Sequence, residues 1–171
     1  GKTTNDTLPT LSGTAQANAI INLYNNSVLM GSTTADSNGL WNFTPSGALS
    51  EGNHAFTATA TNANGVSGVS GSFSVIVDTT PPTAPTILIS ADGGTISGVA
   101  EAGSTVTISL PGGTSVTAIA NSSGVYSVNL PVRQIEGLSL SATATDAAGN
   151  TSLPTSAIAP VLPLLAEDNV T

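Results

Sequence analysis

The chain has 171 residues, and only 7% of them are charged, against about 25% in an average globular protein. Ten acidic and two basic residues give a formal net charge of −8, which excludes the basic surface that nucleic acids and anionic membranes require. The sequence has no cysteine and one histidine, which excludes disulfides, cysteine-ligated metals, a cysteine nucleophile and any site with two histidine ligands. A hydrophobic fraction of 39% suffices for one or two small cores.

An internal repeat defines the domain organisation. Residues 11–43 align without a gap with residues 96–128, at an offset of 85, and residues 58–65 align with residues 142–149 at an offset of 84. The matches are glycines in turns and apolar residues at alternate positions, so the chain holds two copies of one domain. A period of this length is typical of separate domains in series rather than of a solenoid.

The two copies and their flanking segments follow in chain order. We assign residues 1–78 to domain one, residues 79–85 to a linker, residues 86–160 to domain two, and residues 161–171 to a tail or the start of a further segment. The linker contains three prolines, which restrict the backbone and predict an extended, semi-rigid connection. The longest apolar stretch, residues 157–166, is interrupted by prolines and is too short to span a bilayer, so we expect no membrane insertion.

The hydrophobic pattern within each copy has the period of β-strands. Residues 72–77, 105–110 and 138–145 alternate polar and apolar side chains, as expected for strands with one face on a core. Glycine-containing turns separate such runs at short intervals. The sequence therefore predicts an all-β protein of two tandem immunoglobulin-like β-sandwich domains, with about seven strands each and no disulfides.

Several segments of the chain resemble bacterial immunoglobulin-like repeats. They are residues 9–15, 36–43, 51–61, 77–85 and 144–152. Such repeats build the stalks of giant type I-secreted adhesins and biofilm-associated proteins of Gram-negative bacteria. The resemblance implies a structural role in cell adhesion and biofilm formation, an extracellular position on the bacterial cell surface, and calcium at the junctions between repeats. Its implied partners are neighbouring repeats of the same chain and, through the whole adhesin, adjacent cells or a host or abiotic surface.

The positions of the acidic residues point independently to a cation. If consecutive strands reverse direction, the turns that contain Glu101, Asn121 and Asp146 lie at the end of domain two where the linker arrives. By the same argument, Asp6 lies at the end of domain one where the linker leaves, near Asp78. No basic residue is expected there, and clustered carboxylates repel each other unless a cation compensates.

We therefore predict that calcium binds at the junction between the domains. Calcium accepts irregular sets of carboxylate and carbonyl oxygens from turns, whereas magnesium requires a tighter octahedral shell. The main expected ligands are Asp78, Glu101 and Asp146, as the resemblance also suggests, with Asp6 and Asn121 as further ligands. The alternative, that these acids are ordinary solvated turn residues, stays open at this point.

Domain one departs from the pattern of domain two at two of these positions. Gln16 takes the place of Glu101, and Asn62 takes the place of Asp146. We therefore expect the equivalent cation site of domain one to be weak or absent.

No constellation of residues predicts an enzyme. His54 has neither a nucleophile nor an orienting group marked beside it, and we interpret it as a polar residue at the start of a strand. Trp41, which aligns with Tyr126, is interpreted as a packing residue, although an exposed ring there would suit a sugar. Two alternatives to a stalk therefore remain: a module that binds a glycan or a host protein, and an accessory module of a secreted polysaccharide-active enzyme.

Overall fold

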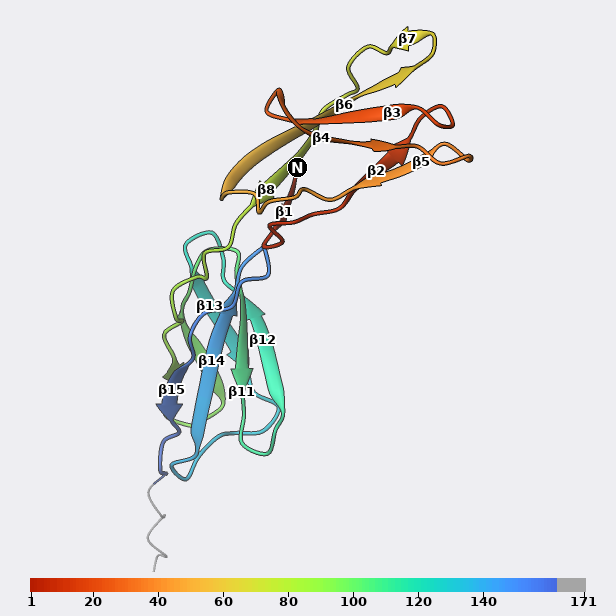
Figure 1. Ribbon diagram of the computed structural model, residues 1–171. Helices are drawn as coiled ribbons and strands as arrows, with labels where there is room; N and C mark the ends of the chain where they lie inside the picture. Colours follow the sequence, from red (N-terminus) through yellow and green to blue (C-terminus); the bar gives the residue numbers. More distant parts are fainter. Residues whose placement is uncertain (163–171) are drawn as a thin grey trace, which may run out of the picture. The chain divides into compact units, whose positions relative to one another are not determined.

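The computed structural model describes residues 1–162, which form β-strands joined by turns and loops (Figure 1). The chain divides into two compact units, Gly1–Thr79 and Thr80–Thr171, of which the second is described as far as residue 162. The described part of the chain contains no helix that could cross a membrane. The all-β class predicted from the sequence is confirmed, whereas the predicted tail, residues 161–171, lies almost wholly outside the described residues.

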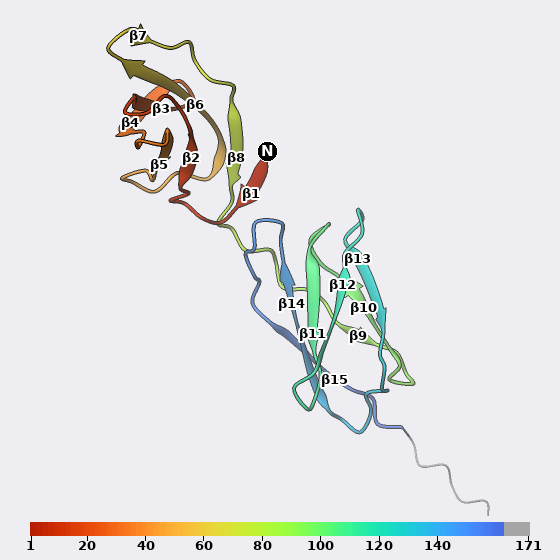
Figure 2. The same ribbon diagram turned by 90° about the vertical axis from the view of Figure 1, so that its right-hand side faces the viewer.

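The first unit contains eight strands in two sheets. One sheet has the order β1–β8–β6–β3–β4, with β7 paired to β6, and the other consists of β2 and β5. The strands are β1 (Lys2–Thr4), β2 (Leu11–Thr14), β3 (Ile20–Asn25), β4 (Val28–Thr34), β5 (Leu40–Phe43), β6 (Gly52–Asn62), β7 (Gly65–Val66) and β8 (Phe73–Val77). β1 lies beside β8 and runs parallel to it, while the other pairs of this unit are antiparallel (Figure 2).

The second unit contains seven strands, again in two sheets. Their orders are β13–β10–β9 and β12–β11–β14–β15, and the paired strands are antiparallel. The strands are β9 (Leu88–Ile89), β10 (Thr95–Val99), β11 (Thr105–Ser109), β12 (Ser115–Ile119), β13 (Val125–Asn129), β14 (Ser139–Thr145) and β15 (Thr155–Ile158). Each unit is thus a small sandwich, as the strand and turn pattern predicts.

Alternation along the strands directs one set of side chains into the core. On β11, Val106 and Ile108 are fully buried, whereas Thr105 and Ser109 are exposed. The period of two follows from the geometry of a strand, in which successive side chains point to opposite faces of the sheet. The three runs that the sequence predicts as strands form β8, β11 and β14.

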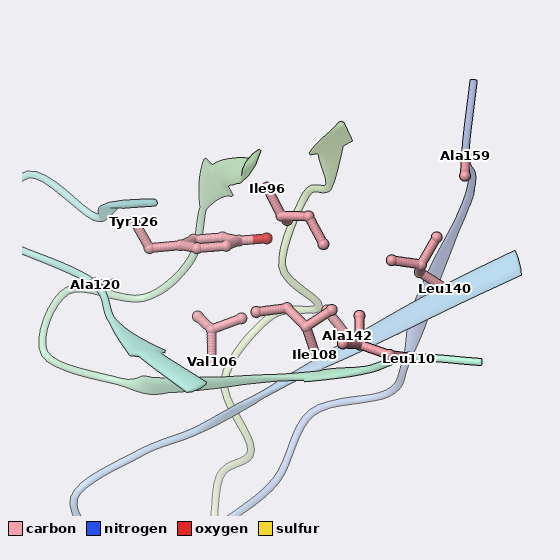
Figure 3. Close-up of a cluster of buried hydrophobic side chains, with 9 residues drawn as sticks. All are labelled: Ile96, Val106, Ile108, Leu110, Ala120, Tyr126, Leu140, Ala142 and Ala159. Atoms are coloured by element: carbon pink, nitrogen blue, oxygen red, sulfur yellow. The ribbon is translucent and has the colours of Figure 1, made fainter. Parts of the chain in front are cut away.

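Each unit has a core of its own. In the second unit, Ile96 of β10 and Tyr126 of β13 face Val106 and Ile108 of β11 across the sandwich (Figure 3). The buried cluster of the first unit consists of Leu11, Ala19, Ile21, Leu23, Phe56, Val75 and Val77. Full burial of an aliphatic side chain of this size contributes about 1.5–3 kcal/mol, so these clusters are the main source of stability in a protein with few charges.

The two units differ at one sheet edge. In the second unit, β9 pairs with β10 and so covers the outer edge of that strand. In the first unit, β1 pairs instead with β8 of the opposite sheet. β2, which the repeat makes the counterpart of β10, therefore pairs with β5 alone.

Replacing Ile108 by Ala should lower the free energy of unfolding of the second unit by about 2–4 kcal/mol, because loss of a fully buried side chain leaves a cavity. Chemical denaturation followed by circular dichroism measures this loss. Trp41 is the single tryptophan and belongs to the first unit, so the transition followed by its fluorescence should not move.

Ile119→Ala is the matched control, because it removes the same atoms from a side chain that is 72% exposed. It should change the free energy of unfolding by no more than about 0.5 kcal/mol. Equal losses for the two variants would contradict the core described above.

Candidate functional site

Three turns of the second unit lie together at one end of its sandwich. β11 begins opposite the ends of β12 and β14, and β10 ends opposite the beginning of β13. The turns next to these strand ends contain Glu101, Asn121 and Asp146. Thr86, which follows the linker, donates its backbone N–H to Val99 O at 2.9 Å, so we call this the linker end of the second unit. Strand reversal therefore brings these three predicted ligands to one end of the unit, as expected.

Asp146 closes its own turn. Its Oδ1 accepts hydrogen bonds of 2.8–2.9 Å from the backbone N–H groups of Ala148, Gly149 and Asn150. Its Oδ2 accepts a further hydrogen bond of 2.9 Å from the Asn150 side-chain amide. A short polar side chain that accepts from its own backbone in this way stabilises a turn without help from any other segment.

These hydrogen bonds lower the pKa of Asp146. Desolvation by its surroundings acts to raise the pKa, but hydrogen bonds from Asn150, Gly149 and Ala148 outweigh it, and the net pKa lies below the usual value for aspartate. The side chain is therefore a carboxylate at neutral pH, and its negative charge is fixed in position by the turn.

Asn121 serves a second turn in a similar way. Its Oδ1 accepts hydrogen bonds of 2.9 and 3.0 Å from the backbone N–H groups two and four residues further along the chain. Asp36, its counterpart in the first unit, accepts from the equivalent N–H groups at 2.8 and 2.9 Å. Because an amide oxygen and a carboxylate oxygen accept the same two hydrogen bonds here, the conformation of this turn does not depend on charge.

Glu101 differs from the other two residues because its side chain is exposed and its main chain makes the turn contacts. Its carbonyl oxygen accepts hydrogen bonds from the backbone N–H of Ser104 at 3.0 Å and from the Ser104 hydroxyl at 2.7 Å. Ser104 is only 1% exposed, so its buried hydroxyl anchors the Glu101 turn to the interior of the unit. The carboxylate of Glu101 lies at the surface of the turn.

The first unit shows how close the two equivalent side chains can lie. Gln16 corresponds to Glu101, and Asn62 corresponds to Asp146. The side-chain amide of Asn62 donates a hydrogen bond to Gln16 Oε1 at a distance of 2.5 Å. Asn62 Oδ1 also accepts a 2.8 Å hydrogen bond from the backbone N–H of Asn64, which corresponds to the bond that Asp146 accepts from Ala148. The repeat thus places a neutral, directly bonded pair where the second unit has two carboxylates.

Acidic residues also gather at one end of the first unit. The ends of β1 and β8 and the start of β6 are in register, and Asp6, Asp78 and Glu51 are the acids next to them. Asp6 Oδ1 accepts the backbone N–H of Leu8 at 2.8 Å. Glu51 Oε1 accepts both the N–H of Thr79 at 3.0 Å and its hydroxyl at 2.6 Å. The structure therefore brings two more predicted ligands, Asp6 and Asp78, to one end of their own unit.

The donor atoms at both ends are of the kind that calcium takes, namely carboxylate and amide oxygens. Within either unit, the described residues include no group of three or more histidine, aspartate or glutamate side chains arranged to hold a metal ion. The linker end of the second unit supplies two carboxylates and one amide oxygen. This set is a partial oxygen shell, which further oxygens must complete if calcium binds.

The opposite end of the second unit carries an ion pair. Arg133 Nη2 lies 3.4 Å from Asp92 Oδ2, and both side chains are exposed. The Ser90 hydroxyl, the Gly94 N–H and the Arg133 guanidinium all lower the pKa of Asp92. An exposed pair of this kind adds little stability, but it distinguishes Asp92 from the acids of the linker end.

Trp41 has the packing role expected from the sequence, and His54 lies near the start of a strand, as expected, but with its ring buried. His54 lies near the start of β6 and is 5% exposed, with one ring nitrogen 2.8 Å from Asn25 Nδ2 and the other 2.8 Å from Ser50 O. Trp41 is half-buried and packs against the core of the first unit, where its ring lies against Gly13. Both ring nitrogens of His54 are therefore engaged with other groups of the same unit.

An open groove of about 880 Å³ on the first unit was missed by the sequence reasoning. It lies between β2 on one side and β6 with the segment that follows it on the other. Its large apolar side chains are Leu11, Ile21, Leu23, Trp41, Phe56 and Phe73. Its lining comes from segments that are far apart in the sequence, from β2 to the start of β8, so no local pattern predicts the groove.

Family models match nearly the whole chain. Residues 1–79 match the family described as "Bacterial Ig-like domain", and residues 81–160 match the one described as "Bacterial Ig domain". No curated protein sequence matches the chain significantly.

Solved structures align with most of this chain at low sequence identity. Fibronectin type III-like modules of CbhA from Clostridium thermocellum are 16% identical, with 94% of this chain and 89% of that chain covered and a TM-score of 0.55. The BSP domain of a biofilm-associated protein is 21% identical over 95% of this chain, with a TM-score of 0.43. A tetra-tandem repeat from the extending region of a large adhesion protein is 23% identical over 91% of this chain and 47% of that one, with a TM-score of 0.37.

The present chain is much shorter than the biofilm-associated chain that it resembles. It covers 29% of the length of that chain. The likeness to the CbhA modules, at 16% identity and a TM-score of 0.55, concerns the fold alone.

Replacing Asp146 by Ala should lower the free energy of unfolding of the second unit by about 1–2 kcal/mol, because three backbone N–H groups lose their acceptor. Asp146→Asn keeps an acceptor oxygen, as Asn62 does in the first unit, and should retain most of the stability at neutral pH. Chemical denaturation of the two variants measures the difference. An alanine variant as stable as the parent would contradict the role of this side chain in the turn.

The pH dependence separates the charge of Asp146 from its geometry. Its folded pKa is depressed, so its stabilising effect is complete above the unfolded pKa of about 3.9 and is lost as the pH falls through the lower folded pKa. Asp146→Asn should lack this part of the acid-induced loss. Denaturation of parent and variant over the range from about pH 6 to about pH 2 measures it, and identical pH profiles would show that the carboxylate has no such effect.

Proposed function

We infer that this chain, which belongs to the bacterial Ig-like domains in both of its units, forms two repeats of the stalk of a bacterial surface adhesin. The observation that carries this inference is that a whole sandwich occurs twice in tandem. Its acidic and amide side chains accept hydrogen bonds within their own turns, so they stabilise the repeat itself. Repeats of this kind hold a binding region of the same protein away from the cell. The proposed outcome is cell adhesion and biofilm formation.

We propose a structural role rather than catalysis for both units. The single histidine is buried against Asn25 and Ser50, so it is not offered to a substrate. Hydrolysis of glycosides needs paired carboxyl groups with one of them in an apolar setting, and the described acids lie in turns instead. The proposed location is the extracellular surface of a Gram-negative bacterium, reached by type I secretion.

We further propose that calcium binds at the linker end of the second unit. Glu101 and Asp146 are the proposed carboxylate ligands there, with Asn121 beside them and Asp78 and Asp6 as the remaining predicted ligands. The linker, residues 79–85, joins this end to Asp78, so a shared ion would stiffen it.

The comparison of the two units supports this proposal. Gln16 and Asn62 are bonded directly in the first unit, so their positions lie within reach of each other. Glu101 and Asp146 replace that pair by two negative charges, which repel by about 1 kcal/mol at 4 Å even in water and by more near protein. Each carboxylate oxygen has about two acceptor directions, and Asp146 Oδ2 accepts one hydrogen bond, so this oxygen can still bind a cation while the turn hydrogen bonds persist. Calcium would turn this repulsion into shared coordination.

The stalk proposal is tested by deletion and replacement in the bacterium that produces the protein. In-frame removal of residues 1–160 should reduce attachment to a surface, because the binding region is held closer to the cell. Two unrelated Ig-like domains of the same length, inserted at the same place, should restore attachment. Failure of the unrelated spacer to restore it, with equal amounts of protein on the surface, would favour a specific binding role for these two units.

The calcium proposal is tested by thermal unfolding in calcium and in excess chelator. Calcium at 100 times its dissociation constant should stabilise the folded chain by about 2.7 kcal/mol and raise the unfolding midpoint by several degrees. The double variant Glu101→Gln/Asp146→Asn reproduces the neutral pair of the first unit and should lose this rise. Asp78→Ala should weaken it.

Asp92→Asn is the matched control, because it removes one carboxylate at the opposite end of the same unit. Its response to calcium should equal that of the parent. A parent midpoint that is the same in calcium and in chelator would refute the calcium proposal and leave the stalk proposal standing.

A further inference from the structure

Two strands from opposite ends of the first unit's sequence form a parallel pair. β1 runs beside β8 in the same direction, with Thr4 opposite Val77. The Asp78 N–H donates to Thr4 O at 2.9 Å, so the ladder continues to the end of β8. Alternate residues of a strand direct their backbone groups to opposite edges. The backbone groups of Lys2 and Thr4 therefore face β8, whereas those of Thr3 face away from it.

The parallel direction decides how tension along the chain acts on this pair. Tension pulls β1 backward at its beginning and β8 forward at its end, and these two points lie at opposite ends of the ladder. The strands are drawn past each other, so the hydrogen bonds of the ladder share the load and break together. Strands pulled apart from the same end would lose their bonds one after another. This load path holds whatever residues precede Gly1, because they all pull on β1 through Gly1.

β8 is held by the body of the unit, whereas β1 is held mainly by its backbone. β8 pairs with β6 over Phe73–Val77, and its side chains Val75 and Val77 are buried in the core. None of the side chains of β1 is fully buried. The hydrogen bonds between β1 and β8 are therefore the contact that gives way first when the two strands are sheared.

A further contact holds the chain just beyond β8. Glu51 lies directly before β6, and its Oε1 accepts the backbone N–H of Thr79 at 3.0 Å and the Thr79 hydroxyl at 2.6 Å. Because β6 pairs with β8, this contact fastens the end of β8 to the body of the unit. Tension that arrives through the linker is thus passed to β8 and β6 together.

The second unit has no such pair among its described residues. Its first strand, β9, pairs with β10, and its last strand before residue 162, β15, pairs with β14. β9 and β15 belong to different sheets, so no backbone ladder joins them within residues 80–162. Until a strand detaches, tension on this unit is carried between the sheets by the packed side chains of the core. In the first unit it passes directly from β1 to β8.

We propose that the parallel pair β1–β8 is a mechanical clamp, which carries tension through the first unit by shear of its backbone hydrogen bonds. The clamp adds a load-bearing function to the stalk role proposed above, and it rests on that role for its use at the cell surface. The clamp itself is a property of the isolated chain. Its test therefore needs no cell, and failure of the clamp is distinguishable from failure of the stalk proposal, which is measured by attachment.

The direction of pulling tests the clamp by force spectroscopy on the whole 171-residue chain. The chain has no cysteine, so two introduced cysteines define where the force is applied. Lys2→Cys with Thr83→Cys pulls the beginning of β1 against the end of β8 and loads the ladder in shear. Lys2→Cys with Gly71→Cys pulls on the beginnings of both strands and opens the ladder bond by bond. The three positions are exposed, and a Cβ on Gly71 meets no atom within 4 Å.

At equal constant force, unfolding in the shear direction should be slower by about fivefold or more. This factor corresponds to at least one additional net hydrogen bond that breaks in the rate-limiting step. The two variants should have the same thermal unfolding midpoint when no force is applied. Equal unfolding rates in the two directions would overturn the clamp.

A proline in β1 tests which backbone groups bear the load. Thr4→Pro removes an N–H that faces β8, whereas Thr3→Pro removes one that faces away and is the matched control. Under constant force in the shear direction, Thr4→Pro should unfold about fivefold faster than the parent, and Thr3→Pro should unfold at the parent rate. Thr4→Ala keeps the backbone N–H and loses only the hydroxyl that accepts from the Asp6 N–H, so it should also unfold at the parent rate.

Trp41 fluorescence shows whether the first unit of each variant is folded before force is applied. A folded Thr4→Pro variant that unfolds at the parent rate would refute the clamp. Equal acceleration by Thr3→Pro and Thr4→Pro would also overturn it, because the loss would then not follow the direction of the backbone groups. If Thr4→Pro does not fold, the comparison of the two pulling directions decides.

Discussion

Two small sheets bury each other's inner faces in each unit, and this packing decides where polar groups can lie. On β11 and β14 every second residue is apolar and faces the opposite sheet, and the positions between them carry neutral serine and threonine. The described acids are therefore confined to the turns, where backbone N–H groups need acceptors. Asp36, Asn121 and Asp146 meet this need with their own side chains, which explains why turns of the two repeats keep the same geometry.

The same geometry can carry a different charge, and the two units diverge on this point. At equivalent positions the first unit has Gln16 bonded to Asn62, and the second has Glu101 and Asp146. The amide pair satisfies itself and gives a turn region that needs no partner. The carboxylate pair leaves a net charge of −2 that cannot be neutralised locally, because the basic side chain nearest in the sequence, Arg133, is paired with Asp92 at the other end of the unit. Comparison of the two repeats thus separates two features of these turns. Folding requires the hydrogen bonds that close the turns, whereas a bound cation would use the negative charge of Glu101 and Asp146.

The sequence predicts those features that arise from local periodicity. Alternation predicts β8, β11 and β14, and strand reversal predicts that Glu101, Asn121 and Asp146 share one end of a unit. An aspartate or asparagine three residues before a glycine recurs at 36, 121 and 146, and this spacing is the sequence signal for turn closure. The partner of β1 could not be predicted, because a three-residue strand has no pattern that distinguishes one sheet from the other.

That single choice of partner has consequences along the whole edge of the first unit. A strand edge with unpaired backbone groups invites pairing, and proteins usually shorten, charge or cover such edges. β2 is only four residues long, and its outward residues Ser12 and Thr14 are exposed and uncharged, so water can satisfy the backbone groups of this edge. The second unit covers the corresponding edge with Leu88 and Ile89, apolar residues that begin three residues after the end of the linker. The short strand before β10 thus extends one sheet of the second unit, whereas the short strand before β2 extends the other sheet of the first unit by pairing with β8, so two copies of one sequence pattern differ in how their two sheets are completed.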